Sequence, residues 1–173
     1  EGLAIQHFEN HRYKLGPLVF ELGLAGSVLH DIRDLCEPSM NTLAKSTEDT
    51  VYLVLRSGFE AVCMHRCEGT FPIRALVLEV GSRRPLGVGA GGLAILSAVA
   101  PEVRQTIIER VEPYLSAFGN LNAQTLEQAC VQSAADGIAL VQNKVSLGVT
   151  AMGVPFRNSM GDPVGSISVA ALT

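Results

Sequence analysis

The sequence predicts an α/β sandwich in which helices cover both faces of an antiparallel sheet. Of its 173 residues, 47% are hydrophobic and 17% are charged, a balance that excludes a disordered chain and suits one compact domain. Helix-like and strand-like spacings of apolar residues both occur along the chain. In segments 149–156 and 164–171 both alternating sets of side chains are largely apolar, so helices are expected on each side of the sheet.

Two helices are expected before the sheet. The first begins at Pro17, which suits a first helical turn, and carries a narrow apolar stripe of Leu18, Leu22, Ala25 and Leu29. The second is predicted from about Asp31 to Glu48, with a wider apolar face opposite charged residues.

The sheet is predicted in two parts. Residues 50–56 and 61–67 form a hairpin around a Ser57-Gly58 turn, and 72–77 forms a third strand. Near the C-terminus, strands are expected at 138–142, 149–156 and 164–171, the last two joined by a turn at 158–163.

Three helices are expected between these strands. A Gly-rich loop at 86–92 leads into a short helix, and a long amphipathic helix follows from about Pro101 and bends or ends near Pro113. Asn122 is a plausible N-cap for the next helix, which Gly137 would terminate.

Composition and charge exclude several functions. The net charge of −4 argues against this chain holding a nucleic acid by itself, because phosphate binding needs clustered Lys and Arg. The longest uncharged stretch, 86–100, is shorter than the roughly 20 apolar residues of a membrane span. The four cysteines are scattered rather than arranged as a disulfide framework, which favours a reducing cytoplasm.

A ligand cavity is predicted on one side of the last two strands. The side chains there are small: Val149, Ala151 and Gly153 on one strand, and Ser166, Ser168 and Ala170 on the other. A helix above them could leave a cavity instead of a filled core. Backbone N–H groups of the Gly-rich turn 87–92 could hold a carboxylate or phosphate. The alternative is that these glycines serve close packing, and the Lys of a nucleotide-binding loop is absent.

Metal binding and catalysis are less well supported. Cys63, His65 and Cys67 alternate along one strand and are expected on one face, but a fourth ligand is missing and neighbouring strand positions rarely converge on one ion. No serine, cysteine or histidine shows the spacing of a nucleophile with its base. We therefore expect no metal, no cofactor and no enzymatic activity.

Several segments carry a resemblance to a known family. They are 11–17 (HRYKLGP) with 21–23 (ELG), 66–69 (RCEG), 84–86 (RPL) with 89–91 (GAG), and 148–149 (GV) with Pro155 and 166–169 (SISV). In their order and spacing they resemble the IclR (isocitrate lyase regulator) family of bacterial transcription regulators. The resemblance implies that residues 1–16 are the remnant of a winged-helix DNA-binding module, 17–30 a linker helix, and 31–173 a GAF/profilin-like effector-binding domain.

The resemblance also implies a ligand site. Family sites use a Gly-Ala pair, matched by Gly89 and Ala90 and followed here by Gly91, together with an apolar residue and a serine. Positions matching the last two are Val149 and Ser168. Three positions depart from the family: Val141 stands where an Asp is expected, Ala151 where a Cys is expected, and Ala170 where a second Ser is expected.

Each departure replaces a polar group by an apolar one, so a small hydroxy- or keto-acid would leave its hydrogen bonds unmade. We expect a bulkier organic acid, such as an aromatic carboxylate. Its acid end would lie near 89–91, and its apolar body against Val149 and Ala151.

The expected partners follow from the same resemblance. They are a small organic acid, DNA through the absent N-terminal domain, and further copies of the chain as a homodimer or homotetramer, with no membrane. The stripe of Leu18 to Leu29, beside the small residues Gly23, Ala25 and Gly26, would pair the subunits, unless it is the buried face of an internal helix. The regulator could be a repressor or an activator. The alternative function is a freestanding GAF-like sensor or interaction module.

Overall fold

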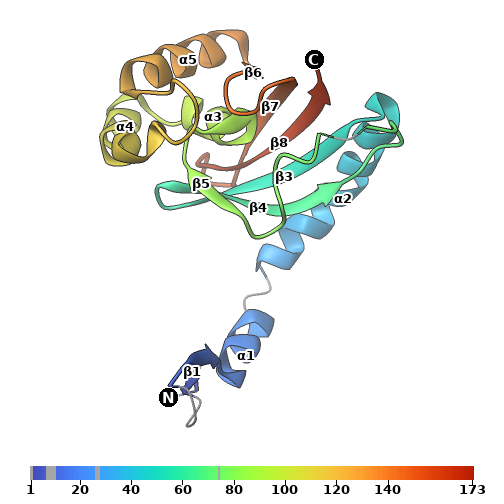
Figure 1. Cartoon of the computed structure of the whole chain (residues 1–173), viewed down its shortest axis with the longest axis vertical. Helices are drawn as coiled ribbons and strands as arrows, with labels where there is room; N and C mark the ends of the chain where they lie inside the picture. The colour runs from blue at the N-terminus through green and yellow to red at the C-terminus, as the bar shows by residue number, and fades with distance from the viewer. Residues whose placement is uncertain (1, 7–10, 26–27, 74) are drawn as a thin grey trace. The chain divides into compact units, whose positions relative to one another are not determined.

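The computed structural model describes residues 2–6, 11–25, 28–73 and 75–173, without the side chains of 24, 25 and 28–31. The chain divides into two compact units, 1–36 and 37–173. In the first unit, β1 (Ala4–Gln6) pairs with β2 (Tyr13–Leu15) as an antiparallel hairpin, followed by α1 (Pro17–Ala25) (Figure 1). The next helix, α2 (Val28–Thr47), crosses the boundary between the units.

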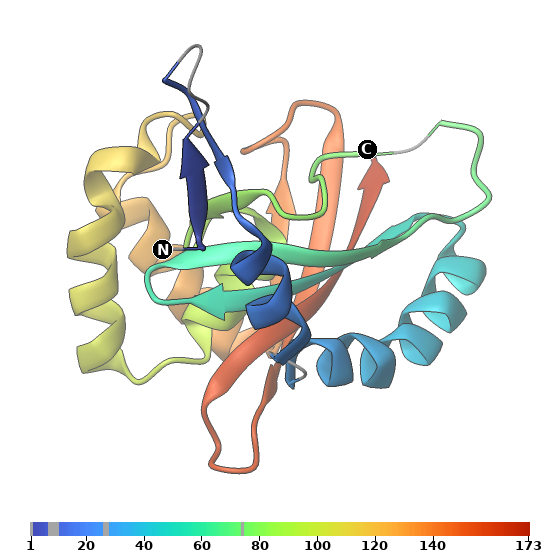
Figure 2. The same cartoon turned by 90° about the horizontal axis from the view of Figure 1, so that it is seen from below.

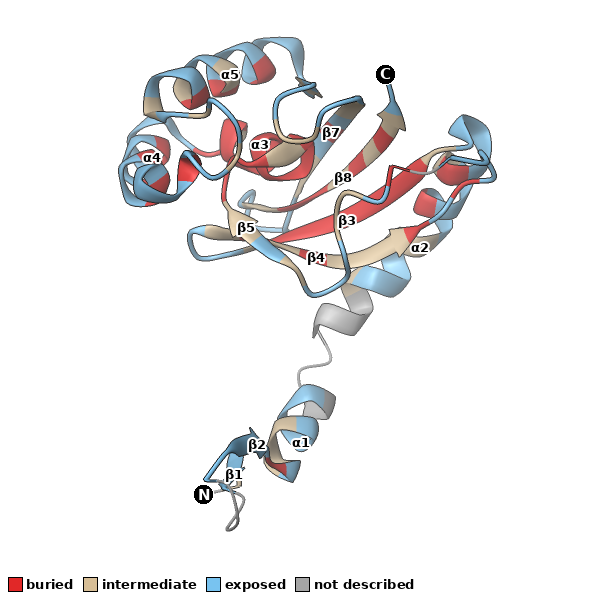
Figure 3. Ribbon diagram, in the orientation of Figure 1, coloured by how far each residue is buried: buried red, intermediate tan, exposed pale blue. Residues whose placement is uncertain are grey.

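The second unit is built on a six-stranded antiparallel sheet with the order β5-β4-β3-β8-β7-β6. Its strands are β3 (Thr50–Ser57), β4 (Glu60–Cys67), β5 (Arg83–Pro85), β6 (Ala139–Gln142), β7 (Val149–Arg157) and β8 (Pro163–Leu172). The ladder between β3 and β8 joins the β3–β4 hairpin to the β7–β8 hairpin. Buried residues concentrate in β3 and α3 (Figure 3).

Helices α3 (Gly89–Ser97), α4 (Pro101–Leu115) and α5 (Ala123–Asp136) lie on one side of this sheet (Figures 1 and 2). Helix α3 is apolar all round and lies directly on the strands, which is typical of a core helix. The caps of α5 are as predicted: Asn122 accepts a hydrogen bond from the Thr125 amide at 2.9 Å, and Gly137 ends the helix in a left-handed conformation with φ of 72°.

The last turns of α2 cover part of the opposite face. Leu43 and Thr47 line a shallow apolar groove together with Met152, Ile167 and Val169 of β7 and β8. The sheet therefore has helices on both sides, as the sequence predicted, although Met152 remains about half exposed.

Two predictions about element boundaries are wrong. Residues 72, 73 and 75–77 do not form a strand, while residue 74 lies outside the described residues; the third strand of the first sheet half is β5 instead. The carbonyl of Ala75 and the amide of Val77 bond to the hydroxyl of Tyr52, at 2.7 and 3.0 Å, and not to a neighbouring strand.

The predicted stripe of Leu18 to Leu29 is not the face of one helix, because α1 ends at Ala25 and Leu29 belongs to α2. Gly26, and the side chains of Ala25 and Leu29, lie outside what the structure describes.

The prediction that Cys63, His65 and Cys67 share a face is also wrong. In the β3–β4 ladder, Leu53 pairs with His65 but the next residue pairs with Cys63, so that Met64 forms a bulge. A bulge reverses the alternation of side chains along a strand. Cys63 therefore faces the helical layer, and the other two face the opposite side, where His65 lies 3.6 Å from Glu37 of α2.

Two further findings concern predictions from composition. No helix within the described ranges has the length and apolar character needed to cross a membrane. Cys36, Cys63 and Cys130 are free thiols.

Candidate ligand-binding site

Half of the small-residue face of β7 and β8 is used for close packing. A Cβ added to Gly153 would lie 2.7 Å from the carbonyl oxygen of Ala90, and one added to Gly91 would lie 2.9 Å from Cγ2 of Val54. The hydroxyl of Ser166 donates a 2.9 Å hydrogen bond to the carbonyl of Gly91. These contacts bring the first turn of α3 directly onto the sheet.

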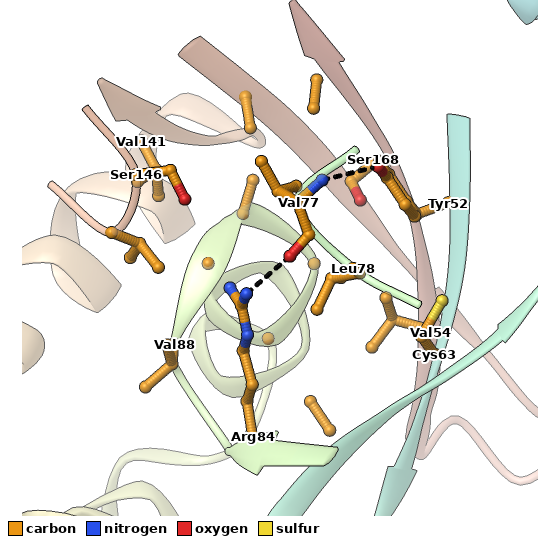
Figure 4. Close-up of a pocket in the computed structure, with 18 of the residues that line it drawn as sticks. Tyr52, Val54, Cys63, Val77, Leu78, Arg84, Val88, Val141, Ser146 and Ser168 are labelled. Carbon is orange, nitrogen blue, oxygen red and sulfur yellow. Dashed lines mark hydrogen bonds between the residues drawn. The ribbon is translucent and has the colours of Figure 1, made fainter. Parts of the chain in front are cut away.

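The other half of the same face lines a cavity between the sheet, the first turn of α3 and two loops (Figure 4). Every residue predicted for the ligand site lies on its wall: Gly89, Ala90, Gly91, Val141, Val149, Ala151, Ser168 and Ala170. The structure thus brings together positions from α3, β6, β7 and β8 that are far apart in the sequence.

The free volume of this cavity is about 50 Å³. A water molecule needs about 10–15 Å³ of such space and a benzene-sized guest about 150 Å³, so the cavity as it stands holds only a few waters. A ligand with a ring requires part of the wall to move.

Two loop segments form the movable part of the wall. Val77 and Leu78 come from the loop between β4 and β5, and Val145 and Ser146 from the loop between β6 and β7. Because loop backbone makes fewer ladder hydrogen bonds than strands do, these segments are the parts of the wall that can open at least cost.

Side chains missed in the sequence hold the first of these loops in place. Besides the two bonds to Tyr52, the carbonyl of Val77 accepts a hydrogen bond of 2.6 Å from Nη2 of Arg84, and the carbonyl of Leu78 accepts one of 3.3 Å from Nη1 of Arg66. Burial raises the pKa of Tyr52, so its hydroxyl stays protonated and remains available as donor and acceptor.

Arg84 is the only charged side chain among the described residues that line the cavity. Its guanidinium carbon lies 5.8 Å from the centre of the Phe118 ring, a cation–π contact. Burial lowers the pKa of Arg84, although an arginine remains protonated at neutral pH. The wall of the cavity therefore combines a mainly apolar surface with one cation.

Two further polar groups lie on the wall of the cavity. Helix α3 begins at Gly89 without a side chain capping its first amides, so these N–H groups have no partner within the helix. Ser168, which is 5% exposed, also lines the cavity, and its hydroxyl forms no hydrogen bond with the described residues.

Of the adjacent Arg83 and Arg84, only Arg84 belongs to a segment that carries the family resemblance, and that segment gives it no role in the site. In β5, Arg84 pairs with the buried Ala61 and Arg83 pairs with Val62, so the two point to opposite faces of the sheet. The alternation would have assigned Arg84 to the inner face, had the strand at 83–85 been recognised.

A metal centre is not evident. Within the described ranges, no group of three or more His, Cys, Asp or Glu side chains is arranged to hold an ion. The Sγ of Cys67 lies 3.6 Å from Nε2 of His65, while Cys63 lines the cavity described above and burial raises its pKa.

A mainly apolar cavity with a few polar groups and one cation is the kind of site at which proteins bind small molecules. The family model described as "Bacterial transcriptional regulator IclR C-terminal" matches residues 27–173. The chain therefore belongs to the IclR family of bacterial transcriptional regulators and corresponds to their C-terminal, effector-binding domain.

Individual relatives agree with this assignment. The chain is 29% identical to the HTH-type transcriptional regulator KipR of Bacillus subtilis, over 91% of this chain and 63% of KipR, and 26% identical to XynR of Escherichia coli, over 99% and 68%. It thus spans less than two thirds of the length of KipR. These relatives are regulators of transcription, not enzymes.

Solved structures share the fold. The IclR protein of Thermotoga maritima is 27% identical, with a TM-score of 0.76 over 99% of this chain and 69% of its own. An IclR homologue from Microbacterium hydrocarbonoxydans, complexed with 4-hydroxybenzoate, is 20% identical, with a TM-score of 0.77 over 99% of this chain and 70% of its own. At that identity, the second likeness concerns the fold alone.

Proposed function

We propose that this chain senses a small organic acid with an apolar body, such as an aromatic carboxylate, and so modulates operator binding by a winged-helix domain. The observation that carries the proposal is the cavity itself, in which Val141, Ala151 and Ala170 present no polar side chain. An apolar wall gives little to a small polar acid but can bury a ring, at about 25 cal/mol per Å² of apolar surface. The complex of a protein of this fold with 4-hydroxybenzoate supports such a ligand.

The acid group would lie near the first amides of α3, at 89–91, and the ring against Val149 and Ala151. Because the cavity holds only about 50 Å³, the ligand would enter by displacing one of the two loop segments of the wall. Ligand binding shifts a conformational equilibrium only if the two conformations differ in affinity. An open and a closed loop provide such a difference.

DNA binding and subunit pairing belong to the same proposal. The net charge of −4 argues against this chain holding DNA by itself, so the operator contacts would come from an N-terminal module. The β1–β2 hairpin and α1 fit the remnant of that module and a linker helix, and pairing of subunits as a homodimer or homotetramer would bring two such modules together. A cytoplasmic location follows from this role.

A thermal-shift screen tests the ligand class. Benzoate and 4-hydroxybenzoate are compared with pyruvate and glyoxylate, and binding is then quantified by calorimetry. A ligand at 100 times its Kd stabilises the folded state by about 2.7 kcal/mol, and a domain of this size gains about 2–4 °C in Tm for each kcal/mol. We expect a rise of about 5 °C or more with the aromatic acids; preferential binding of pyruvate or glyoxylate would overturn the proposal.

Two neighbouring substitutions locate the site. Ala151→Leu fills the cavity from β7 and should abolish the shift, while Thr150→Leu adds a similar side chain to the opposite face of the same strand and should leave it intact. The melting temperatures of both variants without ligand show whether they fold. Equal loss of binding in both variants would contradict a ligand in this cavity.

A further inference from the structure

We propose that Arg84 recognises the acid group of the ligand, and that the acid replaces the carbonyl of Val77 as the hydrogen-bond partner of this guanidinium. The inference rests on the proposed function, because it assigns the anion-binding group of that same cavity. It also makes Arg84 the residue that links ligand binding to the loop between β4 and β5.

The position of Arg84 is fixed by strand alternation. Its cross-strand partner Ala61 is buried and lines the cavity, so the arginine side chain extends along the inner face of the sheet. Figure 4 shows the guanidinium inside the cavity, directed at the carbonyl of Val77. By contrast, Arg83 is about half exposed and bonds to Glu60 at 2.9 Å.

The charge of Arg84 is not neutralised by the described part of the chain. No described carboxylate forms an ion pair with it. Burial lowers the pKa of Arg84, and the nearby side chains of Tyr52 and Cys63 raise it by a smaller amount. A partly buried cation without a counter-ion is costly. A carboxylate entering the cavity would supply that counter-ion.

Geometry brings a second set of donors to the same place. A Cβ built on Gly89 would lie 3.8 Å from Nη1 of Arg84, so this nitrogen lies beside the start of α3, whose first amides have no side-chain cap. An acid group between them could accept hydrogen bonds from the guanidinium and from the first amides of α3 together. The positive charge of the guanidinium and the partial positive charge of the helix N-terminus would both attract a carboxylate. The helix start alone would not define a site, but the arginine beside it does.

The partner that Arg84 now holds is a weaker acceptor than a carboxylate. The bond to the Val77 carbonyl has charge on the donor only, whereas a carboxylate adds the attraction of opposite charges and can accept two parallel N–H···O bonds from one guanidinium. The ligand would therefore compete successfully for Arg84, and the carbonyl of Val77 would lose its donor. The loop would keep its bonds to Tyr52 and to Arg66 but lose one of its attachments, which allows the cavity to widen.

The test compares an acid with its neutral amide, using benzoate and benzamide as probes. Their Kd values are measured by calorimetry for the wild-type chain, for Arg84→Gln and for the control Arg83→Gln, whose side chain lies outside the cavity. A hydrogen bond between charged groups predicts at least a tenfold preference for benzoate in the wild type. Arg84→Gln should reduce this preference to about twofold or less, and Arg83→Gln should keep it.

Arg84→Lys serves as a second variant, because it retains the charge without the planar fork; we expect it to keep part of the preference. Unchanged preference in Arg84→Gln, or equal binding of benzoate and benzamide by the wild type, would refute the role of Arg84 and leave the cavity as the ligand site. If the wild type binds none of benzoate, benzamide and 4-hydroxybenzoate, the proposed function and this inference are refuted together.

Discussion

The close packing of α3 on β7 can be tested by adding one methyl group. In Gly153→Ala, the new Cβ would lie 2.7 Å from the carbonyl oxygen of Ala90 and 2.9 Å from its carbonyl carbon. Both contacts are with backbone, so no side-chain rotation relieves them, and either α3 or β7 must shift. Overpacking of this kind costs about 1–3 kcal/mol.

An alanine in a strand is otherwise favoured over glycine by about 0.5–1 kcal/mol. We therefore expect a net decrease of about 1 kcal/mol in the free energy of unfolding, or a fall of about 2–4 °C in Tm at about 2–4 °C per kcal/mol. Circular dichroism at 222 nm during thermal and urea unfolding measures both quantities. A stability equal to or above the wild type in Gly153→Ala would refute the packing argument.

Three further predictions concern single groups. Tyr52→Phe removes the hydroxyl that bonds to the amide of Val77 at 3.0 Å, so hydrogen exchange of that amide should become about five to ten times faster, as expected for a bond of about 1 kcal/mol; an unchanged rate would show that the loop is held otherwise. Asn122→Ala removes the N-cap of α5 and should cost about 1 kcal/mol in urea unfolding, whereas the exposed Asn120→Ala should cost nothing measurable. Burial raises the pKa of Cys130 to about 12, from an ordinary value of 9.0, so its thiol should resist iodoacetamide at pH 8 until the chain unfolds. Because the unfolded chain releases this proton first, the stabilisation present below pH 9 should be lost between pH 9 and about 12, and early labelling in the folded state would contradict the assignment.

Elements with strong local signals could be predicted from the sequence. The helix from Asn122 to Gly137 has a cap residue at each end, and the hairpins at 50–67 and 149–172 combine apolar strands with polar turns. Local chemistry decides such elements. Segment 72–77 has a strand-like composition, but Ala75 and Val77 bond to the hydroxyl of Tyr52 and Val77 lines the cavity, which no local pattern indicates.

The residues that line the cavity could be predicted from the sequence in part. Its small and apolar residues on β6, β7 and β8 could be named from alternation and from the family resemblance, and the structure places them on one cavity. Tyr52 lies directly opposite Ser168 in the β3–β8 ladder, a pairing that depends on sheet register. The bulge at Met64, which turns Cys63 toward the cavity, likewise has no signal in the sequence.

If the proposed function holds, an organic acid with an apolar body occupies the cavity under the loop between β4 and β5. A crystal structure of the chain grown with benzoate would show whether it does. The carboxylate should lie within hydrogen-bond distance of Arg84 and the amides at 89–91, with the ring against Val149 and Ala151 and the carbonyl of Val77 displaced. Benzoate bound elsewhere, with the cavity closed and Arg84 still bonded to Val77, would contradict the account.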